Sequence, residues 1–299
     1  MTFSAGVKAE LCRAPIDRER AAVAEVCGML LFANQFSNRG LRITTENADF
    51  AHRASRLLKS LFGFDFDRKI IPGGAVRKYS LSIENREKLA AIFDAFGFEL
   101  ASTHTIHLNS ALVEDDATRA AFLRGAFLSG GSAIDPEREY HLELVTSHYY
   151  LAREVLALLY ELEITARLTQ RKGNHIVYFK ESGGIEELLT RIGAPLAAMR
   201  VMETKMYKEL RNSINRKVNC ETANLTKTVD AAAAQLRAIE RIEQTTGLDS
   251  LSEPLRAAAL ARRTYPEATL SELCEALGGT VTKSGLNHRL RKLLALGGE

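Results

Sequence analysis

The chain has 299 residues, of which 46% are apolar and 26% are charged, and its formal net charge is +3. Such a composition excludes disorder over most of the length and is typical of a globular protein of one or two domains. Because the net charge is small, only a local cluster of cations could indicate a nucleic-acid partner.

The N-terminal residues do not predict a targeting sequence. Lys8, Glu10 and Arg13 stand where a signal peptide would be apolar. No run along the chain reaches 18 apolar residues, so we expect no membrane span and no membrane partner. These features predict a protein of the cytoplasm.

The spacing of cysteines and histidines argues against a metal site. The four cysteines are Cys12, Cys27, Cys220 and Cys274. None belongs to a C-x-x-C pair, so we expect reduced thiols and neither a zinc knuckle nor a disulfide framework. His104 and His107 have a spacing that ligands can have, but no third ligand is near them in the sequence. We therefore expect an ordinary polar segment there and no cofactor.

Two stretches of the chain, residues 17–98 and 116–194, show the same order of expected elements. Each begins with a helix and continues through an alternating strand into a second helix, a hairpin and a closing helix. In the first stretch the ranges are 18–32, 41–45, 48–62, 66–83 and 85–96. In the second stretch they are 118–128, 140–145, 147–162, 166–180 and 185–192.

Glycines occur at matching places in the two stretches. The hairpins turn at Pro72-Gly73-Gly74 and at Lys172-Gly173-Asn174, where glycine and asparagine tolerate positive φ. Gly28 and Gly125 lie in the two opening helices, 97 residues apart. We therefore expect an α+β domain with pseudo-twofold symmetry whose halves pack through these helices.

After Pro195 the chain becomes basic and then helical. The charged residues of this part are Lys205, Lys208, Arg211, Arg216 and Lys217, against Glu203 and Glu209. From Leu225, apolar residues recur every three or four positions as far as Ile239, which predicts a helix ending before Gly247. We expect this helix to be a connector packed on its neighbours. It has too few heptads for a dimeric coiled coil, so a monomer is favoured.

The C-terminal residues predict three helices in helix-turn-helix order. The first spans 252–263. The second opens with the capping box Thr269-Leu270-Ser271-Glu272 and ends at Gly278-Gly279. Thr282 can cap the third helix. Its expected core residues are Leu286, Leu290, Leu293 and Leu294.

The third helix has four cations and no acid between residues 281 and 296. Its candidate DNA-binding residues are Lys283, Ser284, Asn287, His288, Arg289, Arg291 and Lys292. The N-terminal part of a recognition helix reaches base edges, so Ser284, Asn287 and His288 are expected to read sequence. Arg291 and Lys292 are expected to contact phosphates. The alternative is a basic, solvated helix that contacts no DNA.

Four segments resemble the WhiA family, sporulation and cell-division regulators of Gram-positive bacteria. They are Phe3-Ser4-x-x-Val7-Lys8-x-Glu10-Leu11, Leu123-Arg124-Gly125-Ala126-Phe127, and residues 211–225 and 283–292. The resemblance implies a tandem αββαββα LAGLIDADG-like homing-endonuclease domain followed by an all-α helix-turn-helix domain similar to sigma-factor region 4. It also implies promoter binding in the control of sporulation, cell division or chromosome segregation. The protein partners that it implies are RNA polymerase holoenzyme, a sigma factor or a partner transcription factor.

The same resemblance provides a test for catalysis. Active LAGLIDADG nucleases hold a divalent metal on an acid near the end of each opening helix, since phosphodiester hydrolysis needs hard oxygen ligands. Those positions here are Gly130 and Ala33, which have no ligating side chain. Asp135 lies five residues beyond Gly130, in an expected turn. We therefore expect a degenerate domain and a protein that is not an enzyme.

Basic residues outside the third helix predict a secondary DNA surface. Its candidates are Arg211, Arg216 and Lys217 of the basic linker, and Arg171 and Lys172 of the second hairpin. The sheets of a LAGLIDADG-like fold form a DNA saddle, and the first hairpin adds Arg68, Lys69, Arg77 and Lys78. For the hairpin cations, ordinary solvated charge is the favoured interpretation, and a DNA-contacting surface is the alternative.

Together these patterns predict a DNA-binding transcription regulator, associated with the nucleoid. The expected domains are the first repeat at 1–110, the second repeat at 111–196, the basic linker and connecting helix at 197–247, and the helix-turn-helix at 248–299. Two other classes remain open: a metal-dependent nuclease, and a scaffold whose basic helix binds an acidic protein.

Overall fold

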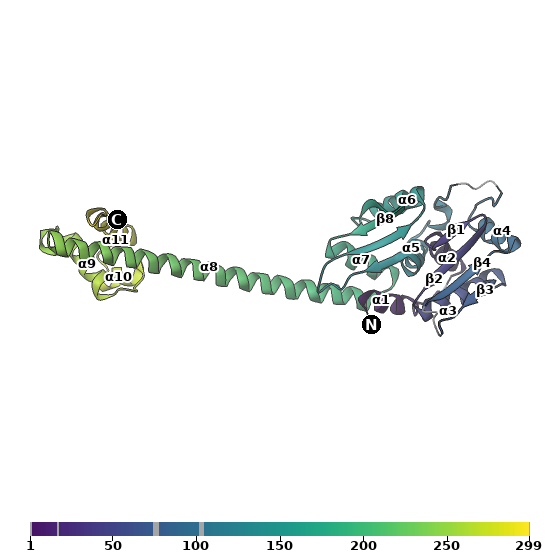
Figure 1. Ribbon diagram of the computed structural model, residues 1–299, viewed down its shortest axis with the longest axis horizontal. Helices are drawn as coiled ribbons and strands as arrows, with labels where there is room; N and C mark the ends of the chain where they lie inside the picture. The colour runs from purple at the N-terminus through teal and green to yellow at the C-terminus, as the bar shows by residue number, and fades with distance from the viewer. Residues whose placement is uncertain (1, 17, 74–77, 102–104, 299) are drawn as a thin grey trace. The chain divides into compact units, whose positions relative to one another are not determined.

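A computed structural model describes residues 2–16, 18–73, 78–101 and 105–298 of the chain (Figure 1). The chain divides into two compact units, Met1–Lys208 and Glu209–Glu299. His104, Gly74 and Arg77 lie outside the described residues, so the histidine pair and part of the first hairpin stay untested predictions. No helix within the described ranges is both long and apolar enough to cross a membrane.

The first half of unit 1 folds as one αββαββα repeat. Its elements are α2 (Glu19–Leu31), β1 (Gln35–Ser37), β2 (Gly40–Thr45), α3 (Ala48–Phe62), β3 (Arg68–Ile70), β4 (Tyr79–Ile83) and α4 (Arg86–Ala95). The strands pair antiparallel in the order β1-β2-β4-β3. Leu41 and Ile43 are buried while Arg42 between them is exposed, so the period of two places one face of this sheet on the core.

The second half repeats the same order of elements. They are α5 (Asp116–Gly130), β5 (Gly131–Ala133), β6 (Leu142–Thr146), α6 (Tyr149–Glu161), β7 (Arg167–Arg171), β8 (Asn174–Phe179) and α7 (Ser182–Ile192). The sheet order, β5-β6-β8-β7, matches that of the first half. A short 3₁₀ turn at Ser110–Leu112 precedes α5. The tandem αββαββα fold is therefore confirmed. The alternation pattern had identified β2 and β6 but not the three-residue strands β1 and β5.

Helices α2 and α5 pack against each other between the two sheets (Figure 1). A Cβ atom on Gly28 would lie 2.8 Å from the backbone nitrogen of Ala126, and closer still to the carbonyl oxygen of Phe122. A Cβ atom on Gly125 would meet the backbone of Met29 and Glu25 in the same way. The predicted packing of the two halves through these helices is confirmed, because only glycine allows the backbones to approach so closely.

A buried ionic network crosses this helix pair. The carboxylate of Glu25 is 0% exposed and accepts hydrogen bonds from Arg53 Nε at 2.5 Å and Arg124 Nε at 2.9 Å. Arg53 Nη1 also donates to the carbonyl oxygens of Cys12 and Ala14, at 3.0 and 2.8 Å. The carboxylate of Glu25 therefore joins α2, α3 and α5, and Arg53 also holds the segment after the N-terminal helix.

Helix α1 (Phe3–Leu11) was not among the expected elements. Thr2 caps it, and Phe3, Val7 and Leu11 are buried at intervals of four residues, which is a helical signal that the sequence did contain. The carboxylate of Glu10 accepts hydrogen bonds from the amides of Leu196 and Ala197, at 2.7 and 3.1 Å. Glu10 therefore satisfies free amides in the first turn of α8.

Helix α8 (Pro195–Thr245) is a single helix of 51 residues, so the predicted basic linker is itself helical. Ala197, Ala198 and Val201 join the core of unit 1, and Ile239 and Ile242 join the core of unit 2. The expected packing of the connecting helix on its neighbours is found at Ala232 and Ile239 but not at Leu225 and Val229. Leu225 is 65% exposed and Val229 is 52% exposed, whereas Ala232 and Ile239 on the same face are buried.

Candidate nucleic-acid interface

The C-terminal helices of unit 2 have the predicted order. After a 3₁₀ turn at Leu248–Ser250 come α9 (Glu253–Thr264), α10 (Leu270–Ala276) and α11 (Lys283–Leu296). The capping box of α10 is formed: Thr269 N donates to Glu272 Oε2 at 2.7 Å, and Glu272 N donates to Thr269 Oγ1 at 3.4 Å. Thr282 Oγ1 accepts from Gly285 N at 3.2 Å and begins α11. Both predicted caps are confirmed.

The turn between α10 and α11 depends on two glycines. Gly278 and Gly279 have φ values of +74° and +66°, in the left-handed region that residues with a Cβ atom rarely adopt. Their amides donate to the carbonyl oxygens of Glu275 and Cys274, at 2.9 and 3.0 Å, and close the end of α10. The turn thereby sets the direction in which α11 leaves α10.

One face of α11 anchors this helix in the core of unit 2. Leu286, Leu290 and Leu293 are buried with Leu255 of α9 and Leu273 of α10. Of the four core residues predicted for α11, the first three are buried and Leu294 is half-buried. Ile239 and Ile242 of α8 complete the same core, so part of it precedes the predicted domain boundary at residue 248.

A buried arginine organises the connection between α9 and α10. Arg262 is 2% exposed; its Nε donates to Gln235 Oε1 of α8 at 2.8 Å, and its Nη1 donates to Ala268 O at 2.6 Å. Nη1 also reaches the carbonyl oxygens of Tyr265 and Pro266. Sequence reasoning missed this residue, because nothing distinguishes it from the exposed Arg263 beside it.

The opposite face of α11 presents the candidate DNA-binding residues. Five of these side chains are exposed: Lys283, Ser284, His288, Arg291 and Lys292. The other two, Asn287 and Arg289, are half-buried. With 3.6 residues per turn, Ser284, His288 and Arg291 share the face directly opposite the buried leucines. Lys283 and Arg289 lie at the two flanks of that face. None of the seven side chains makes a hydrogen bond or ion pair with any described residue.

The three linker cations lie on the exposed middle of α8. Arg211, Arg216 and Lys217 are exposed in unit 2. Arg216 Nε donates to the carbonyl oxygen of Asn212, at 3.4 Å, within its own helix. Arg211 and Lys217 have no partner in the described part of the chain. The three remain available to an anionic partner.

The sheet faces turned away from the core carry several arginines in unit 1. Cross-strand partners point to the same side, so Arg42, Ser82 and Arg68 share this outer face in the first sheet. Arg167 and Arg171 lie on it in the second sheet. Arg171 Nη2 pairs with Glu143 Oε1 at 3.3 Å, and Lys172 occupies the hairpin turn with φ of +51°.

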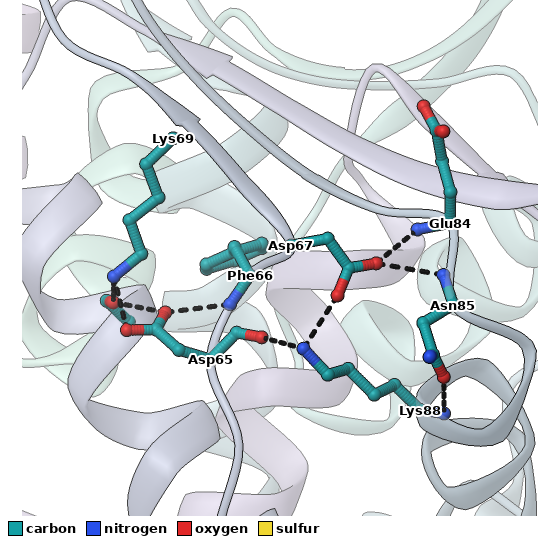
Figure 2. A network of polar contacts seen from close by, with 8 residues as sticks. Asp65, Phe66, Asp67, Lys69, Glu84, Asn85 and Lys88 are labelled. Atoms are coloured by element: carbon teal, nitrogen blue, oxygen red, sulfur yellow. Dashed lines mark hydrogen bonds and ion pairs between the residues drawn. The ribbon is translucent and has the colours of Figure 1, made fainter.

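Two predicted cations of the first hairpin are neutralised. Lys78 Nζ pairs with Glu46 Oε1 at 3.2 Å. Lys69 pairs with Asp65, which also accepts from Ser55 Oγ and the amide of Phe66 (Figure 2). Each of these two lysines therefore forms an ion pair with a neighbouring carboxylate and is not an unpaired cation of the hairpin.

Asp67 forms the second half of the network in Figure 2. Its carboxylate accepts from the amides of Glu84 and Asn85, both at 2.8 Å, and from Lys88 Nζ at 2.6 Å. Burial opposes ionisation of Asp67, but these hydrogen bonds outweigh it and lower the pKa of the carboxyl. The network ties β3 to the start of α4 and so fixes the hairpin.

The two positions where LAGLIDADG nucleases carry acids are closed. A Cβ atom on Gly130 would lie 2.5 Å from the carbonyl oxygen of Val145 and 3.1 Å from Phe32, so a larger residue would require the backbone of β6 to shift. Ala33 is buried in the core. Asp135 pairs with Arg200 Nη2 at 2.9 Å. Across the described ranges, no group of three potential metal-ligating side chains occurs.

Comparison with known proteins agrees with this architecture. Residues 119–211 match the family model described as the WhiA LAGLIDADG-like domain, and residues 214–296 match the WhiA C-terminal HTH domain. Relatives named "Probable cell division protein WhiA" include one from Ruminiclostridium cellulolyticum, 39% identical over 98% of this chain and 96% of the relative. Another, from Alkaliphilus oremlandii, is 38% identical over the same shares.

A solved structure extends the similarity to the fold. It is the full-length DUF199/WhiA from Thermatoga maritima, with a TM-score of 0.61, 26% identity, and coverage of 100% of this chain and 98% of that one. The relatives, the two domain models and the solved structure agree over nearly the whole length. The chain therefore belongs to the WhiA family.

Proposed function

We propose that this chain is a sequence-specific DNA-binding transcription regulator acting in cell division, chromosome segregation or sporulation. The observation that supports the proposal most directly is α11, which presents four cations without intramolecular partners among the described residues: Lys283, Arg289, Arg291 and Lys292. Unpaired cations on the exposed face of the last helix of a helix-turn-helix favour binding in a groove of a polyanion such as DNA. The relatives' name, a cell division protein, gives the biological process.

The proposed roles follow the geometry of α11. Ser284, Asn287 and His288, near its N-terminal end, would contact base edges in the major groove. Arg291 and Lys292, one or two turns further on, would contact phosphates, with Lys283 and Arg289 at the flanks. Secondary phosphate contacts would come from Arg211, Arg216 and Lys217 on α8, and from Arg171 and Lys172 at the second hairpin.

The LAGLIDADG-like unit is proposed to have no nuclease activity. Gly130 has no room for a carboxylate side chain, and Ala33 is buried. We infer that this unit supports DNA binding or a protein partner, such as RNA polymerase holoenzyme, a sigma factor or another transcription factor. Such a regulator would act as a monomer on the nucleoid.

Selection from fragmented genomic DNA tests the sequence-specific part of this proposal. Full-length protein is mixed with sheared genomic duplexes at 150 mM salt, and the bound fragments are sequenced. A shared motif, bound at least about 1,000-fold more tightly than scrambled DNA, is the result expected of a regulator. Recovery of fragments with no common motif would refute sequence-specific recognition.

A further inference from the structure

Two adjoining cavities run beside α3 in unit 1, on the helical side of the first sheet. The larger has a volume of about 720 Å³ and the smaller about 350 Å³, and Arg13 and Arg56 line both. We name them together the α3 groove. Its larger part is also lined by Arg18, Ile16, Leu57 and Leu61. A space of this size is in the range of sites for small organic ligands.

The guanidinium groups of the α3 groove form no hydrogen bond or ion pair within the described ranges, although Asp115 attracts Arg18 electrostatically. They belong to Arg13, Arg18 and Arg56, which lie at one cavity. Of the described acids, Glu19 lines the larger part and Asp49 lines the smaller part. Among the described lining residues, three arginines face one carboxylate, that of Glu19, so the described lining of the larger part is cationic. Arginine presents a planar fork of donors that matches phosphoryl oxygens.

The wall that carries Arg13 is held in place by the buried ionic network. Arg53 is 3% exposed, forms an ion pair with Glu25, and donates to the carbonyl oxygens of Cys12 and Ala14 on either side of Arg13. The backbone at Arg13 is therefore fixed against α3 before any ligand arrives. Preorganisation of this kind reduces the entropy lost on binding.

The α3 groove faces away from the outer sheet surface. Helix α3 packs on β2, β4 and α2 through residues such as Phe50 and Leu58, on the side where Leu41 and Ile43 are buried. Arg42, on the other side of β2, belongs to the outer face. A phosphate bound in the groove would therefore come from a separate small molecule and not from DNA lying on the sheets.

We propose that the α3 groove binds a small molecule with a diphosphate group, such as a nucleoside diphosphate. Arg13, Arg18 and Arg56 would hold the phosphoryl oxygens, and Ile16, Leu57 and Leu61 would contact the less polar part. This site is independent of the DNA-binding proposal, because none of its residues belongs to α11 or to the outer sheet face.

Calorimetric titration of the full chain with inorganic pyrophosphate, and separately with ADP, tests the proposal. We expect one binding site for each probe. In the double variant Arg13→Met, Arg56→Met, the affinity should fall at least about tenfold for each arginine removed. Both side chains are exposed, so the variant should unfold at the temperature of the wild type. The matched control, Arg86→Met on α4, should bind as the wild type does.

Two results would overturn the proposal. One is no heat of binding from either probe at millimolar concentration, or equal binding by the wild type and the double variant. The second test asks whether the groove binds a small molecule or the backbone of DNA. We expect the double variant to bind DNA with the same affinity as the wild type across a salt series. A loss of DNA affinity as large as the loss of pyrophosphate affinity would assign the groove to backbone phosphates of DNA.

Discussion

Gly28 and Gly125 make the same contact in opposite directions: each lies against the backbone of the helix that carries the other. The residues that a new Cβ atom would meet are Phe122 and Ala126 for Gly28, and Glu25 and Met29 for Gly125. Because these are backbone atoms of a packed helix, they cannot move aside as a flexible side chain would. The reciprocal contact sets the distance between the two repeats.

Replacement of Gly125 by alanine should therefore destabilise unit 1 strongly. We expect a loss of about 3 kcal/mol or more, since overpacking against backbone forces the two helices apart. Thermal unfolding followed by circular dichroism measures it. Gly6→Ala in α1 is the matched control, because a Cβ atom there meets nothing within 4 Å and alanine favours a helix. A Gly125→Ala protein as stable as the control would show that the helices are not in close contact.

The reciprocal contact was predictable, because two glycines 97 residues apart occupied the same place in two similar patterns. Alternation likewise located β2, and the S/T-x-x-E motif located α10. These features depend on neighbours in the sequence. Strands β1 and β5 have three residues each, too few for a period of two to be recognised.

The buried contacts of Glu25 were beyond sequence reasoning. Its partners Arg53 and Arg124 are 28 and 99 residues away, and no local pattern links a carboxylate to such distant cations. The ion pairs of Lys69 and Lys78 were missed for a similar reason: both looked like free hairpin charge. Candidate residues on α11 were located by pattern, but whether they contact DNA stays a prediction.

Neutralising Glu25 tests the importance of the buried network. In Glu25→Gln, two guanidinium groups stay buried without a countercharge, so we expect a loss of about 3–5 kcal/mol in unfolding free energy. Urea denaturation followed by circular dichroism measures it. The exposed pair Arg20–Glu114, 3.6 Å apart, supplies the control: Glu114→Gln should change stability by about 0.5 kcal/mol at most. Equal effects of the two changes would contradict this account.

Asp67 should make stability depend on pH in the acid range. Its pKa in the folded protein is lowered from 3.8, so its contribution is complete above that pH and is lost as the pH falls through the lowered value. At pH 6, Asp67→Asn should lose about 1–2 kcal/mol, because three hydrogen bonds to a charged acceptor are weakened. Between pH 6 and pH 3, the difference in unfolding free energy between the wild type and Asp67→Asn should become smaller. A difference that stays constant or grows as the pH falls would contradict the lowered pKa of Asp67.

A designed acid at the degenerate site should not restore catalysis. In Gly130→Asp the new Cβ atom would lie 2.5 Å from the carbonyl oxygen of Val145, so the protein should lose stability and gain no magnesium-dependent cleavage of duplex DNA. Incubation of wild type and variant with supercoiled plasmid, with and without magnesium, measures this. Metal-dependent nicking by the purified wild type would contradict the proposal that the domain is catalytically inactive.

The most direct test of DNA recognition by α11 is a salt series on the full chain. Fluorescence anisotropy would compare the wild type with a variant in which four cations of α11 are replaced by glutamine: Lys283, Arg289, Arg291 and Lys292. A matched control replaces four cations on helices of unit 1: Arg20, Lys59, Arg86 and Arg191. Circular dichroism should show all three proteins folded alike, since the replaced side chains are not part of a core.

Each phosphate contact contributes about 0.9 to the slope of log K against log salt concentration. We predict that the slope for the α11 variant falls by about 2–4, and that its affinity falls at least about 100-fold at 100 mM salt. The control should keep the wild-type slope. If the α11 variant bound DNA with the same slope and affinity as the wild type, α11 would not be the DNA-binding helix.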